Sequence, residues 1–149
     1  MSIKEFSKDE LIKIENQYIF HGSPFMFEMC NPHQAKCDSG NKENTQFAVY
    51  GTNDFLEAVL YAFKKSPEKN YSWSAKHNEN GYYAELHGET FIEEDAFGYV
   101  YCFDKQRFKP TREGTSQHVC YEQIQPSVVY KVYYKDFKNS FVKESNLEL

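Results

Sequence analysis

The triplet His21-Gly22-Ser23 ends an aromatic and aliphatic run, YIFHGS, at residues 18–23. Glycine has no side chain, so a ligand can approach its backbone closely. The neighbouring imidazole offers a further hydrogen bond. The triplet therefore predicts a site for a small planar ligand. The alternative is structural, because glycine and serine also form the turn that a strand end needs, and a buried imidazole can bond a neighbouring carbonyl.

Two tyrosines and one glutamine are further candidates for the same site. Tyr50 lies near the end of the run QFAVYGT, and Tyr61 follows eleven residues later in NDFLEAVLYAFKK. Gln117 belongs to the run SQHVCYEQI, whose composition is typical of a strand. Taken alone, each tyrosine is more simply a core residue, because each lies among apolar neighbours. The order of these residues and the spacing of the tyrosines favour a shared site.

Two helices are expected to position these residues. The first is SKDELIKIENQ, in which Ser7 and Glu10 predict a capping box. Its buried side is expected to contain Leu11, Ile12 and Ile14. The second helix is predicted over 53–65, capped by Thr52 or Asn53, because its apolar residues follow helical spacing.

Six strands are expected, at 18–23, 46–52, 81–88, 97–104, 116–124 and 127–137. We expect the third and fourth of these to be neighbours. Irregular structure is predicted for 24–46 and for the loop that contains Trp73, and a polar tail for 138–149. The sequence thus predicts a single α+β domain over 1–149, with a core at about 18–137 and mostly antiparallel strands.

Composition narrows the classes of function. Aromatic residues make up 17% of the 149 residues, which favours a β-rich fold with an aromatic-walled cleft. The net charge of −5 and the pI near 5.5 argue against a protein that binds nucleic acid mainly through phosphates. There is no signal-like apolar segment and no run of 18 apolar residues. We therefore expect a soluble cytoplasmic protein that does not bind a membrane.

The four cysteines have no C-x-x-C spacing: Cys30, Cys37, Cys102 and Cys120. We expect them to be free thiols in a reducing compartment. Cys30, His33 and Cys37 have side chains that bind zinc, but they provide three ligands rather than four. We therefore predict no metal.

Together, the His-Gly-Ser strand end, the strand end at Tyr50 and the helix with Tyr61 resemble the ADP-ribosyltransferase fold. The branch concerned has a His-Tyr-Glu triad and includes poly(ADP-ribose) polymerases, diphtheria-type toxins and small bacterial enzymes such as rifampin ADP-ribosyltransferase. The run QHVCYEQIQPSVVYKV, from Gln117 past Tyr130, resembles the late strands of that branch. The resemblance covers about 18–137. It implies split antiparallel sheets with a few helices and an NAD cleft between them.

The resemblance also implies a role for each residue. The backbone of Gly22 would bind the nicotinamide amide of NAD, which is the donor substrate. His21 would donate a hydrogen bond to the adenosine-side ribose. Ser23 would contact the amide or shape the turn. Tyr50 and Tyr61 would hold the nicotinamide ring between two aromatic faces.

The sequence departs from the family at the catalytic glutamate, whose position falls on Gln117. A glutamine can accept a hydrogen bond from a ribose hydroxyl, but it has no negative charge to stabilise an oxocarbenium-like ribose. Losing such a partner typically lowers the rate by a factor on the order of 10²–10³. Two other carboxylates are alternatives. Glu122 would face the opposite side of a regular strand, and Glu113 lies in the preceding loop.

Three functions remain open. The first is an NAD-dependent mono-ADP-ribosyltransferase, with His21 and Gln117 as catalytic residues and a small molecule or a protein as the acceptor in preference to nucleic acid. The second is a module that binds NAD or an ADP-ribosyl ligand without turnover, which Gln117 favours. The third is a structural or interaction domain in which His21 and the tyrosines are core residues. The oligomeric state and the role as toxin, resistance enzyme or regulatory protein are open too.

Overall fold

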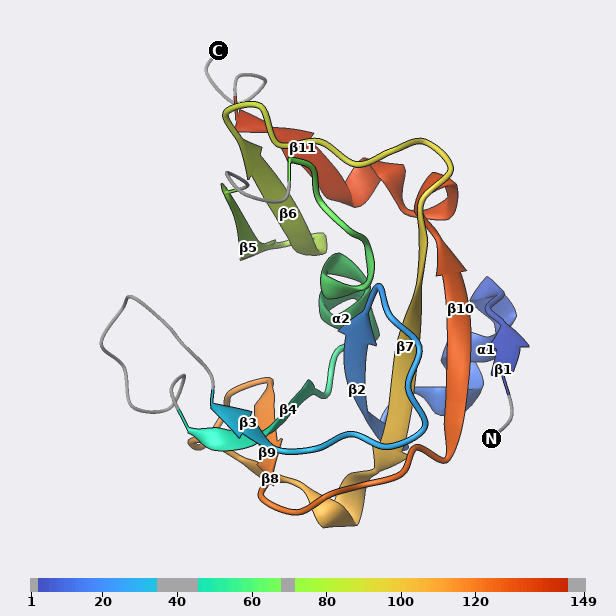
Figure 1. Cartoon of the computed structure of the whole chain (residues 1–149), viewed down its shortest axis with the longest axis vertical. Helices are drawn as coiled ribbons and strands as arrows, with labels where there is room; N and C mark the ends of the chain where they lie inside the picture. The colour runs from blue at the N-terminus through green and yellow to red at the C-terminus, as the bar shows by residue number, and fades with distance from the viewer. Residues whose placement is uncertain (1–2, 35–45, 68–71, 145–149) are drawn as a thin grey trace.

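The computed structural model describes residues 3–34, 46–67 and 72–144, which form an α+β fold of two β-sheets and two α-helices (Figure 1). The larger sheet has the strand order β1 (Ile3–Glu5), β10 (Val128–Tyr133), β7 (Phe97–Asp104), β2 (Tyr18–Ser23), β4 (Phe47–Thr52), β9 (Gln117–Cys120) and β8 (Lys109–Pro110), with β3 (His33–Gln34) paired to β4. The smaller sheet has the order β11 (Phe141–Lys143), β6 (Gly81–His87) and β5 (Ser72–Asn78). The helices are α1 (Lys8–Ile14) and α2 (Phe55–Ala62), and the 3-10 turns are η2 (Lys105–Arg107), η3 (Tyr134–Asp136) and η4 (Lys138–Ser140). The α+β class predicted from the sequence is confirmed.

The larger sheet is nearly interrupted between β2 and β4. These antiparallel strands share a single pair of Cα partners, Phe20 and Thr52, whereas β2 pairs with β7 along its whole length. Beyond Phe20 the two strands diverge, and β4, β9 and β8 turn away from β2, β7 and β10 (Figure 1). The divergence leaves space between β2 and β4 at the end of β2 that carries the His-Gly-Ser triplet.

Helix α2 packs very closely on β2 and β7. A Cβ atom added to Gly22 would lie 1.8 Å from the carbonyl oxygen of Ala58, and one added to Gly98 would lie 1.8 Å from that of Ala62. Such a separation is far below any van der Waals contact, so both strand positions need glycine for the helix to reach the sheet. Gly22 therefore has a structural role that does not depend on a ligand.

The core occupies both faces of the larger sheet. Successive residues of β2 alternate between the faces, with Phe20 on the α2 side and Ile19 on the other. The α2 side also contains Leu86 of β6 and Phe141 of β11. One apolar cluster therefore joins the helix to both sheets.

Helix α1 differs from the prediction in two respects. It begins after Ser7, but the Ser7 side chain makes no capping hydrogen bond, so the predicted capping box is wrong. The Glu10 carboxylate instead accepts a hydrogen bond from a tyrosine hydroxyl of β10. Ile14 is buried and Leu11 is half-buried, but Ile12 is 81% exposed, so its predicted burial is wrong. Leu11 and Ile14 are three residues apart and share a helix face that excludes Ile12.

Helix α2 is shorter than predicted at both ends. Its N-cap is Asp54, whose carboxylate accepts the backbone N–H of Glu57 at 3.0 Å, so the predicted cap at Thr52 or Asn53 is wrong. The Thr52 hydroxyl instead accepts the backbone N–H of Asp54 at 3.0 Å. The helix ends at Ala62, and the next residue is extended.

The strand predictions were correct in position but not in every pairing. Strands β2 and β7 have the predicted bounds, and β4, β6, β9 and β10 lie within the predicted ranges. However, β6 pairs with β5 and β11, whereas β7 pairs with β10 and β2, so the expected pairing of 81–88 with 97–104 is wrong. Strand β5 was expected to be a loop, and β11 lies in the expected polar tail. Both are strands at the edges of the smaller sheet, and both are only partly buried.

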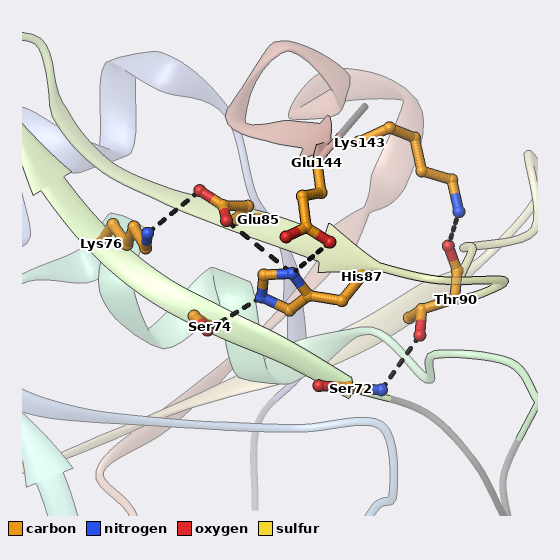
Figure 2. A network of polar contacts seen from close by, with 8 residues as sticks. All are labelled: Ser72, Ser74, Lys76, Glu85, His87, Thr90, Lys143 and Glu144. Carbon is orange, nitrogen blue, oxygen red and sulfur yellow. Dashed lines mark hydrogen bonds and ion pairs between the residues drawn. The ribbon is translucent and has the colours of Figure 1, made fainter. Parts of the chain in front are cut away.

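Polar contacts hold β5 and the end of β11 to β6 (Figure 2). The His87 imidazole lies 3.1 Å from the Glu144 carboxylate through Nδ1 and 3.0 Å from the Ser74 hydroxyl through Nε2. The buried Glu85 carboxylate lies 3.2 Å from the Lys76 ammonium and 3.7 Å from His87 Nδ1. These contacts link the three strands of the smaller sheet through their polar side chains.

Candidate functional site

A cleft of about 420 Å³ opens where β2 and β4 diverge. Its size lies within the range of roughly 300–1,000 Å³ that is common for small-molecule sites. Five of the six predicted site residues line it: His21, Gly22, Tyr50, Tyr61 and Gln117. They come from β2, β4, α2 and β9. The lining also includes Thr52 and Glu57, which the sequence analysis did not assign to the site.

His21 connects the two diverging strands. Its Nδ1 atom lies 2.6 Å from the carbonyl oxygen of Tyr50. A carbonyl only accepts hydrogen bonds, so Nδ1 carries the proton and Nε2 of the neutral ring is an acceptor. Burial lowers the pKa of His21, and this outweighs the opposite effect of the Tyr50 hydrogen bond; the nearby His33 lowers the pKa further. The ring is therefore neutral at pH 7.

The two tyrosines differ in burial. The Tyr61 side chain is 48% exposed, and its ring makes an edge contact with Trp73 at 4.9 Å between centroids. The interpretation of Tyr61 as a core residue is therefore wrong. Tyr50 is half-buried, and its hydroxyl accepts the backbone N–H of Gln46 at 2.7 Å. Both rings belong to the wall of the cleft.

Gln117 lines the cleft, whereas Ser23 does not. Gln117 is the first residue of β9, and its Oε1 atom accepts the Thr111 hydroxyl at 3.2 Å. Ser23 is buried, and it is not among the described residues that line the cleft. Its hydroxyl accepts the backbone N–H of Phe25 at 3.1 Å. This contact corresponds to the turn-shaping role, one of the two roles considered for Ser23.

Glu57 is the one carboxylate among the described residues that line the cleft. Its Oε1 atom accepts hydrogen bonds from the hydroxyls of Thr52 and Ser116, the latter at 2.9 Å. The sequence contained a signal for this position. Glu57 precedes Tyr61 by four residues, so the two share one face of the helix.

The two carboxylates considered as replacements for the missing glutamate lie elsewhere. The Glu122 side chain is 77% exposed and forms an ion pair with Arg107 at 3.2 Å. Glu113 is exposed in the loop before β9. Neither is part of the cleft lining.

The described cysteines Cys30, Cys102 and Cys120 are buried free thiols. Burial raises the pKa of Cys30 to about 12, so this thiol is protonated at neutral pH. Cys37, and with it the zinc alternative that includes His33, lies outside the described residues. Away from the cleft, Glu85, His87 and Glu144 offer ligand atoms within 4.8 Å of one another. The ion pairs and hydrogen bonds of Figure 2 already satisfy these side chains.

Searches of protein-family models, curated proteins and solved structures found no match to this chain. Within the described residues, no helix has the length and apolar character needed to cross a membrane. The functional argument therefore depends on the cleft itself.

Proposed function

We propose that the protein is an NAD-dependent mono-ADP-ribosyltransferase, which moves one ADP-ribose group from NAD to an acceptor. One observation carries the proposal. Five residues chosen from the sequence for this chemistry lie far apart in the chain, from His21 to Gln117, yet all line one cleft.

The architecture gives further support. An ADP-ribosyltransferase-like fold has antiparallel sheet segments that separate around the NAD cleft. The single pair of Cα partners between β2 and β4, and the cleft beside it, agree with this arrangement. The ADP-ribosyltransferase-like fold is part of the proposal.

The cleft residues suit the nicotinamide end of NAD. The Gly22 backbone would bind the carboxamide, and the rings of Tyr50 and Tyr61 would contact the flat heterocycle. Neutral His21 presents Nε2 as an acceptor, so a ribose hydroxyl would donate to it. This reverses the donor role that the resemblance implied for His21.

The reaction breaks the bond between ribose C1′ and the nicotinamide nitrogen. Nicotinamide leaves as a neutral molecule with the bonding electron pair, and positive charge develops on the ribose. A nucleophilic atom of the acceptor then bonds to C1′ and releases its proton to water. In this proposal Gln117 forms a hydrogen bond to the reacting ribose.

A second candidate function follows from Gln117. A cleft that binds NAD but lacks a charge at this strand position would hold the ligand without turning it over. The protein would then be an NAD-binding or ADP-ribose-binding module.

The proposal also includes a cytoplasmic location and an acceptor that is a small molecule or a protein. The net charge of −5 favours these acceptors over nucleic acid, because phosphates are repelled by an acidic surface.

The test is calorimetric titration of NAD into the purified protein, with released nicotinamide measured by chromatography on the same sample. Tyr61→Ala removes an exposed ring of the cleft with little effect on folding, and we expect it to weaken NAD binding roughly tenfold. Phe97→Ala is a matched control, because Phe97 is 46% exposed and does not line the cleft.

The outcomes separate the candidates. Binding with release supports the transferase, and binding without release supports the binding module. No binding at millimolar NAD, or equal binding by wild type and Tyr61→Ala, would overturn both functions.

A further inference from the structure

The cleft contains a carboxylate that the sequence analysis did not assign to the site. Gln117 occupies the strand position where a negative charge was expected, and neither Glu113 nor Glu122 reaches the cleft. Glu57 comes from a different element, the first turn of α2, and lines the same cleft as Gln117.

The two hydrogen-bond donors to the Glu57 carboxylate are neighbours of Gln117. Thr52 on β4 is the Cα partner of Gln117 on β9, and cross-strand partners have Cβ atoms about 4.5–5.5 Å apart. The Thr52 hydroxyl donates to the Glu57 carboxylate. The second donor to this carboxylate is Ser116, the residue directly before Gln117. The carboxylate is thus held by one cross-strand neighbour and one chain neighbour of Gln117.

The hydrogen bonds orient the carboxylate. Both donors bond to Oε1, and no described residue bonds to Oε2. The Ser116 hydroxyl is itself 2.9 Å from the hydroxyl of Tyr82 on β6, so the network extends into the smaller sheet. Such a network fixes the side chain before a ligand binds and leaves one oxygen for a further contact.

We propose that Glu57 is the catalytic carboxylate of this cleft. The inference rests on the proposed function. As the bond from ribose C1′ to the nicotinamide nitrogen breaks, the Glu57 charge stabilises the positive charge that develops on the ribose, while Gln117 contributes only hydrogen bonds. Helix α2 then provides the charge that is absent from β9, and Glu57 itself exchanges no proton or electron in the step.

The test compares Glu57→Gln with wild type. Glutamine keeps an acceptor oxygen for Thr52 and Ser116, so the hydrogen bonds survive and only the charge is lost. We expect nicotinamide release to slow by about 10²–10³-fold, while the NAD dissociation constant stays within about threefold. Glu122→Gln is the matched control, because it makes the same chemical change at an exposed carboxylate outside the cleft. It should release nicotinamide at the wild-type rate.

A double variant distinguishes a catalytic charge from a structural role. In Glu57→Gln, Gln117→Glu a negative charge returns at the neighbouring position Gln117, so nicotinamide release should be at least tenfold faster than in Glu57→Gln. If Glu57 had a merely structural role, release by the double variant would stay at the rate of Glu57→Gln.

The failure of this inference differs from that of the proposed function. If wild type binds NAD and releases nicotinamide, but Glu57→Gln does so within threefold of its rate, the role of Glu57 is overturned and the transferase stands. If wild type binds NAD without release, or does not bind it, the transferase itself fails, and the role of Glu57 fails with it.

Discussion

At the residue scale, Lys65 is a buried cation just beyond α2. Its ammonium donates to the carbonyl oxygens of Leu60 at 2.5 Å and Phe63 at 2.9 Å, and lies 4.0 Å from the centre of the Trp73 ring. Burial lowers the pKa of Lys65 to about 7, against an ordinary value near 10.4 in the unfolded chain. Lys65 therefore couples the stability of the fold to pH.

The sign of this coupling follows from proton binding. Below pH 7, Lys65 is protonated in both states. Between pH 7 and about 10 the unfolded state binds more protons, so the free energy of unfolding should rise with pH, by at most about 1.4 kcal/mol per pH unit from this group. Urea unfolding at pH 6 to 9 measures the rise. The rise of the free energy of unfolding with pH should be smaller in Lys65→Met than in wild type, and unchanged in Lys64→Met. If wild type and Lys65→Met showed the same pH dependence, the prediction would be contradicted.

The residues of the cleft were partly predictable. His21, Tyr50 and Tyr61 were found because the order of residue types and the spacing of the tyrosines are properties of the sequence itself. Glu57 was missed because the helix dipole stabilises an acidic residue in a first helical turn, so its presence there does not indicate a binding or catalytic role. Its position in the cleft depends on hydroxyl donors from β4 and from the residue before β9, which are distant in sequence.

At the element scale, the close packing of α2 on the sheet gives a direct test of the fold. Gly98→Ala would place a Cβ atom 1.8 Å from the Ala62 carbonyl, so the helix must shift. We expect a loss of about 3 kcal/mol or more in the free energy of unfolding, measured with urea. The control is Gly114→Ala, whose Cβ meets no atom within 4 Å but whose φ of +78° is unfavourable for alanine. Gly114→Ala should lower the free energy of unfolding by about 1–2 kcal/mol. Equal losses in the two variants would argue against the close packing of α2 on β7.

The two strands that the sequence did not predict, β5 and β11, contribute few buried residues. The central strands β2 and β7 are rich in buried apolar residues, so their pattern is clear from the sequence. Strand β5 reads SWSAKHN and has no fully buried residue, and β11 has only three residues. Their pairing with β6 depends on the polar contacts of Figure 2 and on Phe141, which packs in the core. Such long-range contacts leave no periodic signal in the sequence.

At the scale of the whole molecule, the two sheets share one apolar cluster. Val100 of β7, Leu86 of β6 and Phe141 of β11 belong to the same group of buried residues as the inner face of α2. Removing the smaller sheet from this cluster would expose apolar surface of the larger one. The two sheets should therefore unfold together, as a single domain over 1–149 would.

The single tryptophan, Trp73, makes this prediction measurable because it lies in β5 of the smaller sheet. We expect urea unfolding followed by Trp73 fluorescence to coincide with unfolding followed by far-ultraviolet circular dichroism, which reports mainly the larger sheet. Trp73 also contacts Tyr61 of the cleft wall. On the proposed function, NAD binds the folded state alone and should move both transitions to higher urea by the same amount. A fluorescence transition at lower urea than the dichroism transition would mean that the smaller sheet unfolds separately, and that the cleft wall at Tyr61 loses its support before the rest of the fold.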